Sequence, residues 1–416
     1  MTAACFLVVG YNNTRVHDVA LLRDLCHREF RAALVLVTDE ARPHDTAAAD
    51  VVLVAPFDVD VAPRAASRVA AEVGRRGLRP IGVLPFSDRG IVLGAHLASR
   101  FELPGAAPTE AVAGLDKHRL RAIEAAAADH PAGYTPVRSL AVHSLGEFEA
   151  AVAHLGGTAF VKPTSEGNSR GCQLVPGIGA CPEIWAALAP YHERGVMVET
   201  LVTGAREYSW DYVGGARWLT EKHTTTGRFR AEFQQVVPAP LDPAETALLD
   251  RAGDHVRRLV SPANGAFHNE LFLRAHGAAA VETNMRPGGM HIWDLARLAF
   301  PGFDPWLAWL RWSTGDAPLT AQPVARAASG IRMLRAPGDG VVVSTPDIAA
   351  VAAKLDIPLH HAELSTSPSA RVRAEVTDNA GFVGKIVLVA EDAKTLLDRL
   401  DRLGAAVEER IDVRAR

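Results

Sequence analysis

Residues 267–294 read FHNELFLRAHGAAAVETNMRPGGMHIWD, and this stretch decides the predicted fold and site. Apolar and polar residues alternate over 267–273, a short turn follows, and the chain returns over 278–283. Such alternation is typical of β-strands, and two runs joined by a turn predict a hairpin. We therefore expect Glu270 and Glu282 to lie side by side on one face of a sheet.

Oxygen ligands are concentrated on that predicted face. Asn284 follows Glu282 by two residues, so both side chains point the same way. Two carboxylates and an amide oxygen suit Mg²⁺, which takes oxygen ligands and keeps positions for water and substrate phosphates. Glu270 alone would more simply be a solvated surface residue. The set predicts that Glu270, Glu282 and Asn284 bind Mg²⁺.

Arg286 and two glycines follow these ligands directly. The planar guanidinium of Arg286 can hold two oxygens of a phosphate or carboxylate. Gly288 and Gly289 let backbone N–H groups approach the same anion. The hairpin and the residues after it therefore predict a magnesium-nucleotide site in which Arg286 meets an anion.

A second stretch, 160–171, delivers a lysine and then a loop of small polar residues. A predicted strand over 158–162 ends at Lys162, and the glycines of the loop permit the backbone angles that a phosphate-cradling loop needs. An ordinary mobile surface loop is the alternative. The sequence has no GxxxxGK[ST] motif, which excludes a P-loop. The expected phosphate-binding residues of this stretch are Lys162, Ser165, Gly167, Asn168, Ser169 and Gly171.

A third stretch, 196–211, is predicted to run strand, short hinge, strand. The extended backbone of a hinge can pair with an adenine edge, and Glu207, just after the turn, can accept hydrogen bonds from ribose hydroxyls. Taken singly, Glu199 and Glu207 would more simply be solvated strand carboxylates. Their order after the glycine-bearing loop favours the nucleotide-binding interpretation.

Length and composition bound the class of protein. The chain has 416 residues, 48% hydrophobic and 22% charged, which indicates two or three globular domains. Lys and Arg total 44 against 48 Asp and Glu, so the net charge of -4 gives no reason to expect nucleic acid as a partner. We read no signal peptide and no membrane-spanning run, and we expect a cytoplasmic protein with inert or buried thiols.

The pattern of elements predicts an α/β region followed by α+β regions. Short apolar runs alternate with helical stretches near the amino terminus, which indicates a parallel sheet covered by helices. The GYNNTR stretch at 10–15 lacks the later glycines of a dinucleotide fingerprint, and 321–330 is expected to be a linker. The predicted domains are 1–115, a parallel α/β domain; 116–318, with a lid subdomain at about 135–203; and 319–416, a small α+β domain.

Together these stretches resemble the ATP-grasp superfamily, whose members hold ATP between two α+β subdomains and activate a carboxylate by phosphoryl transfer. Lysines, glycine loop, hinge, acidic residues and ETNMRPGG occur here in the family's order. The resemblance implies an ATP-grasp fold preceded by a Rossmann-like parallel domain. It also implies that Lys117 and Lys162 bind phosphate. Glu199 and Leu201 would belong to the hinge that pairs with adenine, and Glu207 would accept hydrogen bonds from the ribose hydroxyls.

Within the superfamily the chain is similar to carboxylate-amine ligases of the L-amino-acid ligase type, which are bacilysin-synthetase-like. The segment 219–229, LTEKHTTTGRF, and the GxxGKIVLVAxD stretch from 381 carry that similarity. Val198 departs from the family, because many relatives have a second acidic residue there. The resemblance implies a ligase that forms an amide or peptide bond between amino-acid-like substrates through an acyl phosphate, releasing ADP and phosphate.

Substrates in such an enzyme are small-molecule carboxylates and amines, and Lys222 and His291 are the candidates to face them. Packing is the simpler explanation for either residue alone. An ATP-grasp kinase and a catalytically silent nucleotide-binding regulator are the alternatives. A homodimer is expected only because most oligomers are symmetric dimers.

Overall fold

The computed structural model describes residues 3–11 and 15–415, so part of the GYNNTR stretch lies outside the described residues. An amino-terminal sheet has four parallel strands in the order β3-β2-β1-β4. The strands are β1 (Ala3–Val9), β2 (Ala33–Thr38), β3 (Val51–Val54) and β4 (Leu78–Pro85). The helices are α1 (Val16–Leu25), α2 (Asp45–Ala48), α3 (Ala62–Arg75) and α4 (Gly90–Arg100). The predicted parallel α/β region is thereby confirmed.

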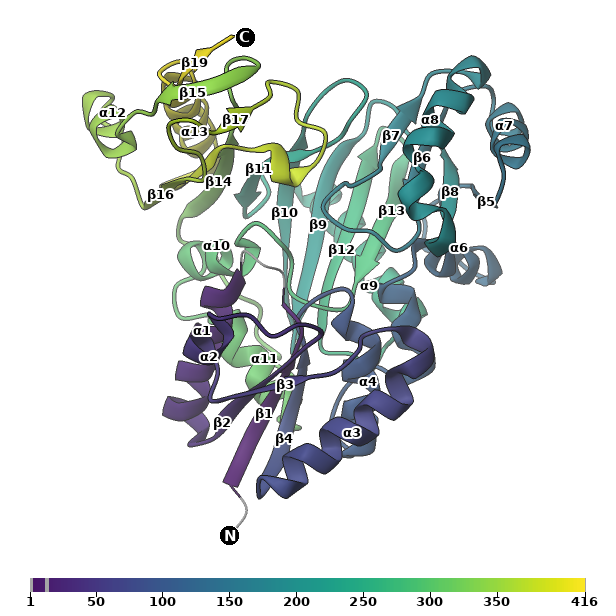
Figure 1. Ribbon diagram of the computed structural model, residues 1–416, viewed down its shortest axis with the longest axis vertical. Helices are drawn as coiled ribbons and strands as arrows, with labels where there is room; N and C mark the ends of the chain where they lie inside the picture. Colours follow the sequence, from purple (N-terminus) through teal and green to yellow (C-terminus); the bar gives the residue numbers. More distant parts are fainter. Residues whose placement is uncertain (1–2, 12–14, 416) are drawn as a thin grey trace.

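Alternation along β1 explains why helices cover both faces of this sheet. Phe6 and Val8 pack against Val19 of α1, whereas Leu7 packs against Leu93 of α4 on the other face. Figure 1 shows α1 and α2 on one side of the sheet and α3 and α4 on the other. The carboxyl ends of these strands point toward the middle of the molecule, where the loop after β4 meets the rest of the chain.

A second sheet lies in the predicted lid range and is called the lid sheet below. Its order is β5-β8-β6-β7, and all of its pairs are antiparallel. Phe148 and Ile184 lie in its buried core, beneath two helices. The elements are β5 (Ser139–Val142), β6 (Ala159–Pro163), β7 (Gln173–Val175), β8 (Val196–Thr200), α7 (Leu145–His154) and α8 (Cys181–Ala187).

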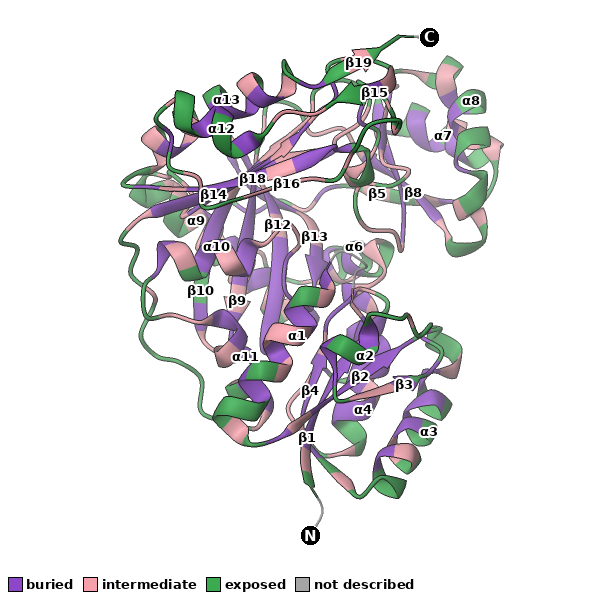
Figure 2. Ribbon diagram, turned by 60° about the vertical axis from the view of Figure 1, so that its left-hand side comes forward, coloured by how far each residue is buried: buried purple, intermediate pink, exposed green. Residues whose placement is uncertain are grey.

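The third sheet has eight strands in the order β13-β12-β9-β10-β11-β14-β18-β16. It contains both the predicted hairpin and strands of the carboxy-terminal segment, so one sheet continues across position 319. The strands are β9 (Arg206–Val213), β10 (Ala216–Thr224), β11 (Glu232–Val237), β12 (Ala266–Arg274), β13 (Gly277–Asn284), β14 (Ala328–Leu334), β16 (His361–Leu364) and β18 (Gly384–Ala390). Figure 2 shows these strands as mainly buried.

Two expectations for the carboxy-terminal segment need correction. The stretch 321–330 is not a linker throughout, because β14 begins at Ala328, where it can pair with β11 and β18. The sequence RVRAEV at 371–376 also predicts a strand, but β17 covers just Arg371–Val372 and pairs with the first residues of β15 (Gly340–Ser344). The remaining elements are β19 (Asp412–Arg414), α12 (Ile348–Lys354) and α13 (Ala393–Glu408).

Helices of the central region pack on the eight-stranded sheet. Asp242 caps α9 (Pro243–Val260) and Glu245 returns a bond to the Asp242 backbone, which is the capping box that the sequence DPAE at 242–245 predicts. Asp116 caps α6 (Lys117–Ala126), so Lys117 begins that helix. The others are α5 (Pro108–Ala111), α10 (Ile292–Ala299) and α11 (Pro305–Ser313).

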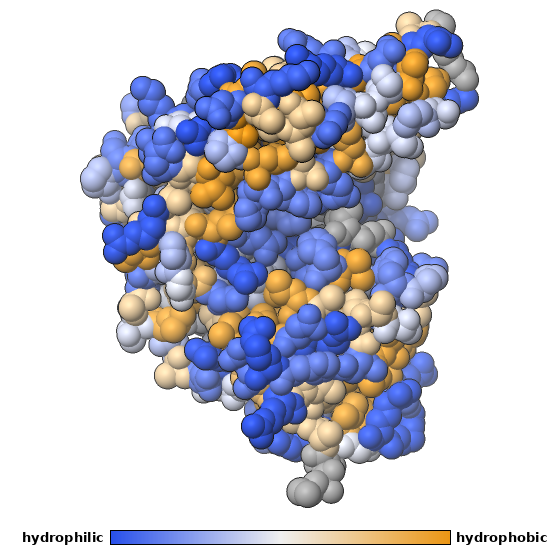
Figure 3. Space-filling model, turned by 90° about the vertical axis from the view of Figure 1, so that its left-hand side faces the viewer, coloured by the Kyte–Doolittle hydropathy of each residue, from blue (hydrophilic) through white to orange (hydrophobic). Residues whose placement is uncertain are grey.

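The last features of the fold are the hydropathy of the surface and the lengths of the helices. On the face seen in Figure 3, hydrophilic residues cover much of the surface and hydrophobic residues form patches between them. Among the described residues, no helix is both long enough and apolar enough to cross a bilayer.

Candidate active site

The predicted hairpin is present as β12 and β13. Glu270 pairs directly with Glu282, and His268 pairs with Asn284, so their four side chains share one face. The register shifts between Glu270 and Leu271, directly after the paired carboxylates. The side chains of Glu270 and Glu282 are 20% and 18% exposed, which leaves both accessible from one side.

Two lysines lie close to these carboxylates and offset their negative charge. The ammonium of Lys117 lies 3.0 Å from Glu282 Oε2, and Lys222 contacts Glu270. Burial would raise the pKa of Glu282, but the charge of Lys117 and the hydrogen bonds from Asn284 and Lys117 together lower that pKa. Burial likewise opposes ionisation of Glu270, yet Lys222 and His268 hold its pKa well below the usual value. Both carboxylates are therefore ionised oxygen donors, as a divalent cation requires.

His268 connects Glu270 to a buried carboxylate. Its Nδ1 lies 2.9 Å from Asp211 Oδ1 and its Nε2 lies 3.3 Å from Glu270 Oε1. Burial would lower the pKa of His268, but Asp211 and Glu270 raise it to about 9. Ser209 donates to Asp211 at 2.6 Å, so a continuous chain of hydrogen bonds orients Glu270.

The lid sheet contributes Lys162 and Glu199. Lys162 Nζ lies 2.7 Å from Glu199 Oε2, and Arg121 Nε donates to Glu199 Oε1 at 2.7 Å. Arg121 also donates to the carbonyls of Ala280 and Val281, each at 2.9 Å. Both carboxylate oxygens of Glu199 are thus held in a buried ion-pair cluster that links the lid sheet to β13. Leu201, half-buried, follows β8 in the segment that leads to β9.

The glycine loop, defined as residues 164–171, has an unusual backbone. Asn168, Ser169 and Gly171 have φ values of 59°, 60° and 71°, in the left-handed region. Lys117 Nζ donates to the carbonyl of Glu166 at 2.6 Å. The same lysine therefore holds both the loop and the predicted metal ligand Glu282.

Other loop contacts come from distant segments. Ser169 Oγ donates to the carbonyl of Arg230 at 3.1 Å, and the Asn168 carbonyl accepts from the backbone N–H of Asn379 at 3.2 Å. Ser165 Oγ lies 3.3 Å from Thr164 Oγ1. The loop is thus fastened to the segment just before β11 and to a short 3-10 helix (Asn379–Gly381) before β18.

Two further glutamates surround Lys222 and differ from those of the hairpin. Glu232 Oε2 lies 3.4 Å from Lys222 Nζ, and Glu207 is paired with Lys222 across β9 and β10. Thr224 Oγ1 donates to Glu207 Oε1 at 3.2 Å. Burial, only partly offset by the charge of Lys222, raises the pKa of both Glu207 and Glu232. The site therefore carries more carboxylate charge than its lysine neutralises.

Arg286 is held by the amino-terminal domain. Its Nε and Nη2 each lie 2.7 Å from Asp88 Oδ1, and Nη1 donates to the carbonyl of Pro287 at 2.8 Å. A Cβ built on Gly288 would lie 2.7 Å from His268 Nδ1, so only glycine fits there without displacing His268.

His291 lies apart from the carboxylates, at the junction of three segments. Its Nδ1 is 3.1 Å from Asp294 Oδ2 and its Nε2 is 3.0 Å from the ammonium of Lys385. The His17 ring stacks on it at 5.3 Å. His17, His291 and Asp294 lie close enough to share a metal, but a neighbouring ammonium repels a cation, so we read the cluster as a polar contact.

Residues distant in sequence therefore converge. Arg121 joins Glu199, and through it Lys162, to the carbonyls beside Glu282, and Lys117 joins Glu282 to the glycine loop. The thiol of Cys172 lies near these charges, and burial raises its pKa to about 11. Cys172 is half-buried, unlike the buried thiols of Cys5, Cys26 and Cys181.

Some site residues escaped the sequence analysis. Asp88, Asp211 and Glu232 were not singled out, although Asp88 follows a parallel strand at its carboxyl end, where α/β proteins often bind ligands. Glu232 is on the strand paired with β10, in a polar run EFQQ that precedes apolar residues. Asp211 had no local signal, because its role depends on the pairing of β9 with β12.

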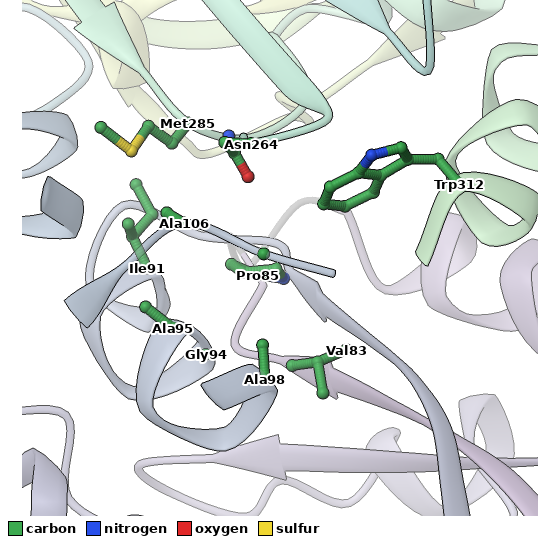
Figure 4. Close-up of a pocket in the computed structure, with 11 residues that line it drawn as sticks. Val83, Pro85, Ile91, Gly94, Ala95, Ala98, Ala106, Asn264, Met285 and Trp312 are labelled. Atoms are coloured by element: carbon green, nitrogen blue, oxygen red, sulfur yellow. The ribbon is translucent and has the colours of Figure 1, made fainter. Parts of the chain in front are cut away.

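A small cavity beneath Met285 is too small to be the nucleotide site. Its volume is about 10 Å³, enough for roughly one water molecule. Figure 4 shows it between α4, the end of β4 and Trp312, with apolar groups around it. It marks the packed seam between the amino-terminal domain and the ETNMRPGG segment.

This architecture, a lid sheet facing a larger antiparallel sheet with charged side chains between them, is the ATP-grasp fold, as a solved structure that covers the whole chain shows. The predicted fold class is thereby confirmed. No family model matches the sequence, and no curated protein matches it either.

Three solved structures document the likeness. The L-amino acid ligase from Bacillus licheniformis superposes with a TM-score of 0.77 at 15% identity, covering 100% of this chain and 99% of that one. N5-carboxyaminoimidazole synthetase from Staphylococcus aureus, complexed with ADP, gives 0.65 at 13% identity, covering 96% of both chains. The biotin carboxylase domain of Hydrogenobacter thermophilus 2-oxoglutarate carboxylase, with MgADP, ADP and bicarbonate, gives 0.64 at 14%, covering 99% and 90%.

Proposed function

We propose that this protein is an ATP-dependent carboxylate-amine ligase that joins amino-acid-like substrates through an acyl phosphate and releases ADP and phosphate. One observation carries the proposal: Glu270 and Glu282 are paired in register, with Asn284 beside them and Arg286 just beyond. The whole-chain likeness to an L-amino acid ligase supports the type of reaction.

In the proposal, the nucleotide is bound by residues of α6, the lid sheet and the glycine loop. Lys117 and Lys162 supply the positive charge for phosphates, and Ser165, Gly167, Asn168, Ser169 and Gly171 supply loop donors. The left-handed backbone of the loop can turn successive N–H groups toward an anion. In the proposal, Glu207 accepts hydrogen bonds from the ribose hydroxyls, and the backbone near Glu199 and Leu201 pairs with the adenine edge.

The residues fit Mg²⁺. Glu270 and Glu282 are ionised by neighbouring positive charges, and Asn284 Nδ2 donates to Glu282 Oε1 at 3.0 Å, which leaves its amide oxygen available. We propose two Mg²⁺ ions, replaceable by Mn²⁺. When bound, they would neutralise charge on the phosphate oxygens.

The chemistry then needs positioning and charge, and no protein nucleophile. An oxygen of the substrate carboxylate attacks the γ-phosphorus and ADP leaves. The amine attacks the carbonyl carbon of the acyl phosphate, and phosphate leaves with loss of a proton from nitrogen. Arg286 and Lys162 stabilise the oxygen charge that develops. The glycine loop keeps water from the acyl phosphate.

The substrate side is assigned to Lys222 and His291. Lys222 lies among three carboxylates, and His291 lies where the amino-terminal helix α1 and strand β18 meet. We propose that these residues face the carboxylate and amine substrates. The division at 115 and 318, a cytoplasmic location and a homodimer stay predictions.

A pairwise screen of amino acids for ADP release, with mass spectrometry of positive reactions, tests the proposal. A ligase releases ADP rapidly only with both substrates and yields a product whose mass is the sum of the two less water. ADP release with one substrate and a phosphorylated product would identify a kinase. ATP binding without ADP release across the whole screen would identify a silent regulator.

The role of Arg286 has its own test. Arg286→Ala should lower turnover by about 10²- to 10³-fold, because a preorganised charge at the reacting oxygens is lost. Thermal unfolding should show a folded protein. Turnover close to that of the unchanged protein would remove Arg286 from the mechanism.

A further inference from the structure

Asp88 lies in the loop between β4 and α4, outside the elements that supply the other site residues. Its side chain is 23% exposed, and its Oδ1 receives both Nε and Nη2 of Arg286 at 2.7 Å. Two N–H groups on one edge of the guanidinium thus donate to the same carboxylate oxygen, and this side-on contact fixes the plane of the guanidinium.

The contact with Asp88 uses some of the N–H donors of Arg286 and leaves others for an anion. A guanidinium has five N–H groups. One each from Nε and Nη2 addresses Asp88, and one from Nη1 donates to the Pro287 carbonyl at 2.8 Å. One N–H on each terminal nitrogen is left without a partner among residues 3–11 and 15–415. Those two donors are what a phosphoryl group with two free oxygens needs.

The glycine loop meets the other oxygen of Asp88. A Cβ built on Gly167 would lie 3.2 Å from Asp88 Oδ2, so the loop backbone packs directly against this carboxylate. Asp88 is therefore in contact with the loop that covers the site and with the cation that serves it.

The segment after Arg286 is also held from the amino-terminal domain. Buried Arg15 donates from Nη1 to the carbonyl of Gly288 at 2.6 Å, and its guanidinium lies 4.7 Å from the Phe86 ring. Two separate contacts thus fix residues 286–288 relative to the parallel sheet.

We propose that Asp88 is a positioning residue for phosphoryl transfer. It orients Arg286 so that the two remaining donors meet the transferring phosphoryl group, and the glycine loop completes this arrangement when it lies on Asp88. The inference rests on the proposed nucleotide site, and it does not depend on which carboxylate and amine react.

Asp88→Asn tests the inference because it keeps the size of the side chain and removes its charge. We expect phosphoryl transfer from ATP to slow by about 10- to 100-fold, as for groups that orient another functional group, with the KM for ATP changed less than about 3-fold. Asp39→Asn is the matched control, since Asp39 pairs with exposed Arg89 in the same domain at 2.5 Å. Equal rates for the two variants would overturn the proposal.

A double-mutant cycle separates positioning from structural damage. Combining Asp88→Asn with Arg286→Lys should cost little more than Arg286→Lys alone, because Asp88 acts through the arginine. Fully multiplicative losses would show that Asp88 acts by another route and would overturn the proposal.

A binding measurement is independent of turnover. MgADP with aluminium fluoride mimics the transferring phosphoryl group. Asp88→Asn should weaken its binding by about 10-fold and leave MgADP alone unchanged. Equal weakening of both, or of neither, contradicts the proposal. If the unchanged protein binds both probes yet makes no amide in the screen, only the ligase function fails.

Discussion

Two pairs of glutamates around Lys222 and Lys117 have pKa values that are shifted in opposite directions. Glu270 and Glu282, on β12 and β13, have lowered pKa values, whereas Glu207 and Glu232, on β9 and β11, have raised ones. All four are partly buried and the residue type is the same, so the difference comes from the cations. Two lysines and His268 contact the first pair, whereas the second pair shares Lys222 with Glu270.

The comparison separates roles within one site. Carboxylates kept ionised suit metal ligation, and carboxylates with raised pKa values suit contacts to hydroxyl or ammonium groups, which bring hydrogen-bond donors or charge. The excess of negative charge around Lys222 favours a cationic ligand over an anionic one there. Variants at these positions should therefore differ in their effects.

Glu282→Gln should lower turnover by about 10²-fold or more, because it removes an ionised metal ligand. Steady-state ADP release against Mg²⁺ concentration measures it. Glu221→Gln is the control, because Glu221 is next to Lys222 on β10 and points to the other face. If both variants lose the same activity, the ionised pair has no special role.

Lys222→Met should destabilise the protein by about 3 kcal/mol, because it leaves partly buried carboxylates without their shared cation. Urea unfolding measures the loss, and Lys354→Met, an exposed change at the end of α12, should have no effect. An unchanged midpoint for Lys222→Met would mean that the carboxylates are protonated or solvated, contrary to the comparison.

Stability should respond to pH with opposite signs for the two pairs. A raised pKa means that Glu207 favours folding when protonated, so its contribution is present below the unfolded pKa and is lost as pH rises through the folded pKa. Glu207→Gln should therefore stabilise the protein at pH 8, by about 1 kcal/mol, and not at pH 4. Thermal unfolding at the two pH values measures this.

For Glu282 the sign reverses. Its lowered pKa gives stability that is present above the unfolded pKa and is lost as pH falls through the folded pKa. Glu282→Gln should thus cost more stability at pH 7 than at pH 3. If the stability of the Glu207 and Glu282 variants changed with pH in the same direction, the distinction between the two pairs of glutamates would be wrong.

Thr224→Val has the smallest expected effect. It removes the hydroxyl that donates to Glu207 and keeps the shape of the side chain. The pKa of Glu207 should rise by about one pH unit or less, since one hydrogen bond to a charged group is worth roughly 1.5 kcal/mol. NMR titration of labelled glutamate carboxyls measures it, and a fall in that pKa would contradict the assigned contact.

The hairpin could be predicted because its signal is local. Alternation and a turn indicated the two strands and their shared face, but the direct pairing of Glu270 with Glu282 depends on the register shift after Glu270, since regular pairing from Arg274 and Gly277 would place Val281 opposite Glu270. The parallel sheet was predictable for a similar reason, since buried parallel strands are short apolar runs.

What the sequence did not predict depends on partners from other segments. Arg286 was expected to meet an anion, but its contact with Asp88 joins positions separated by 198 residues. Glu199 was read as a hinge residue, and only the folded chain shows both its oxygens taken by Arg121 and Lys162. The start of β14 was missed because a strand that adds to an existing sheet needs no hairpin partner next to it in sequence.

The addition of β14 to β11 has a consequence for how the protein can move. Backbone hydrogen bonds run without interruption from β13 to β16, so the carboxy-terminal strands are built into the same rigid body as the hairpin carboxylates. The lid sheet shares no strand with that body. Any relative movement at the site must therefore occur between separate sheets, and the hairpin carboxylates keep their position relative to the carboxy-terminal strands.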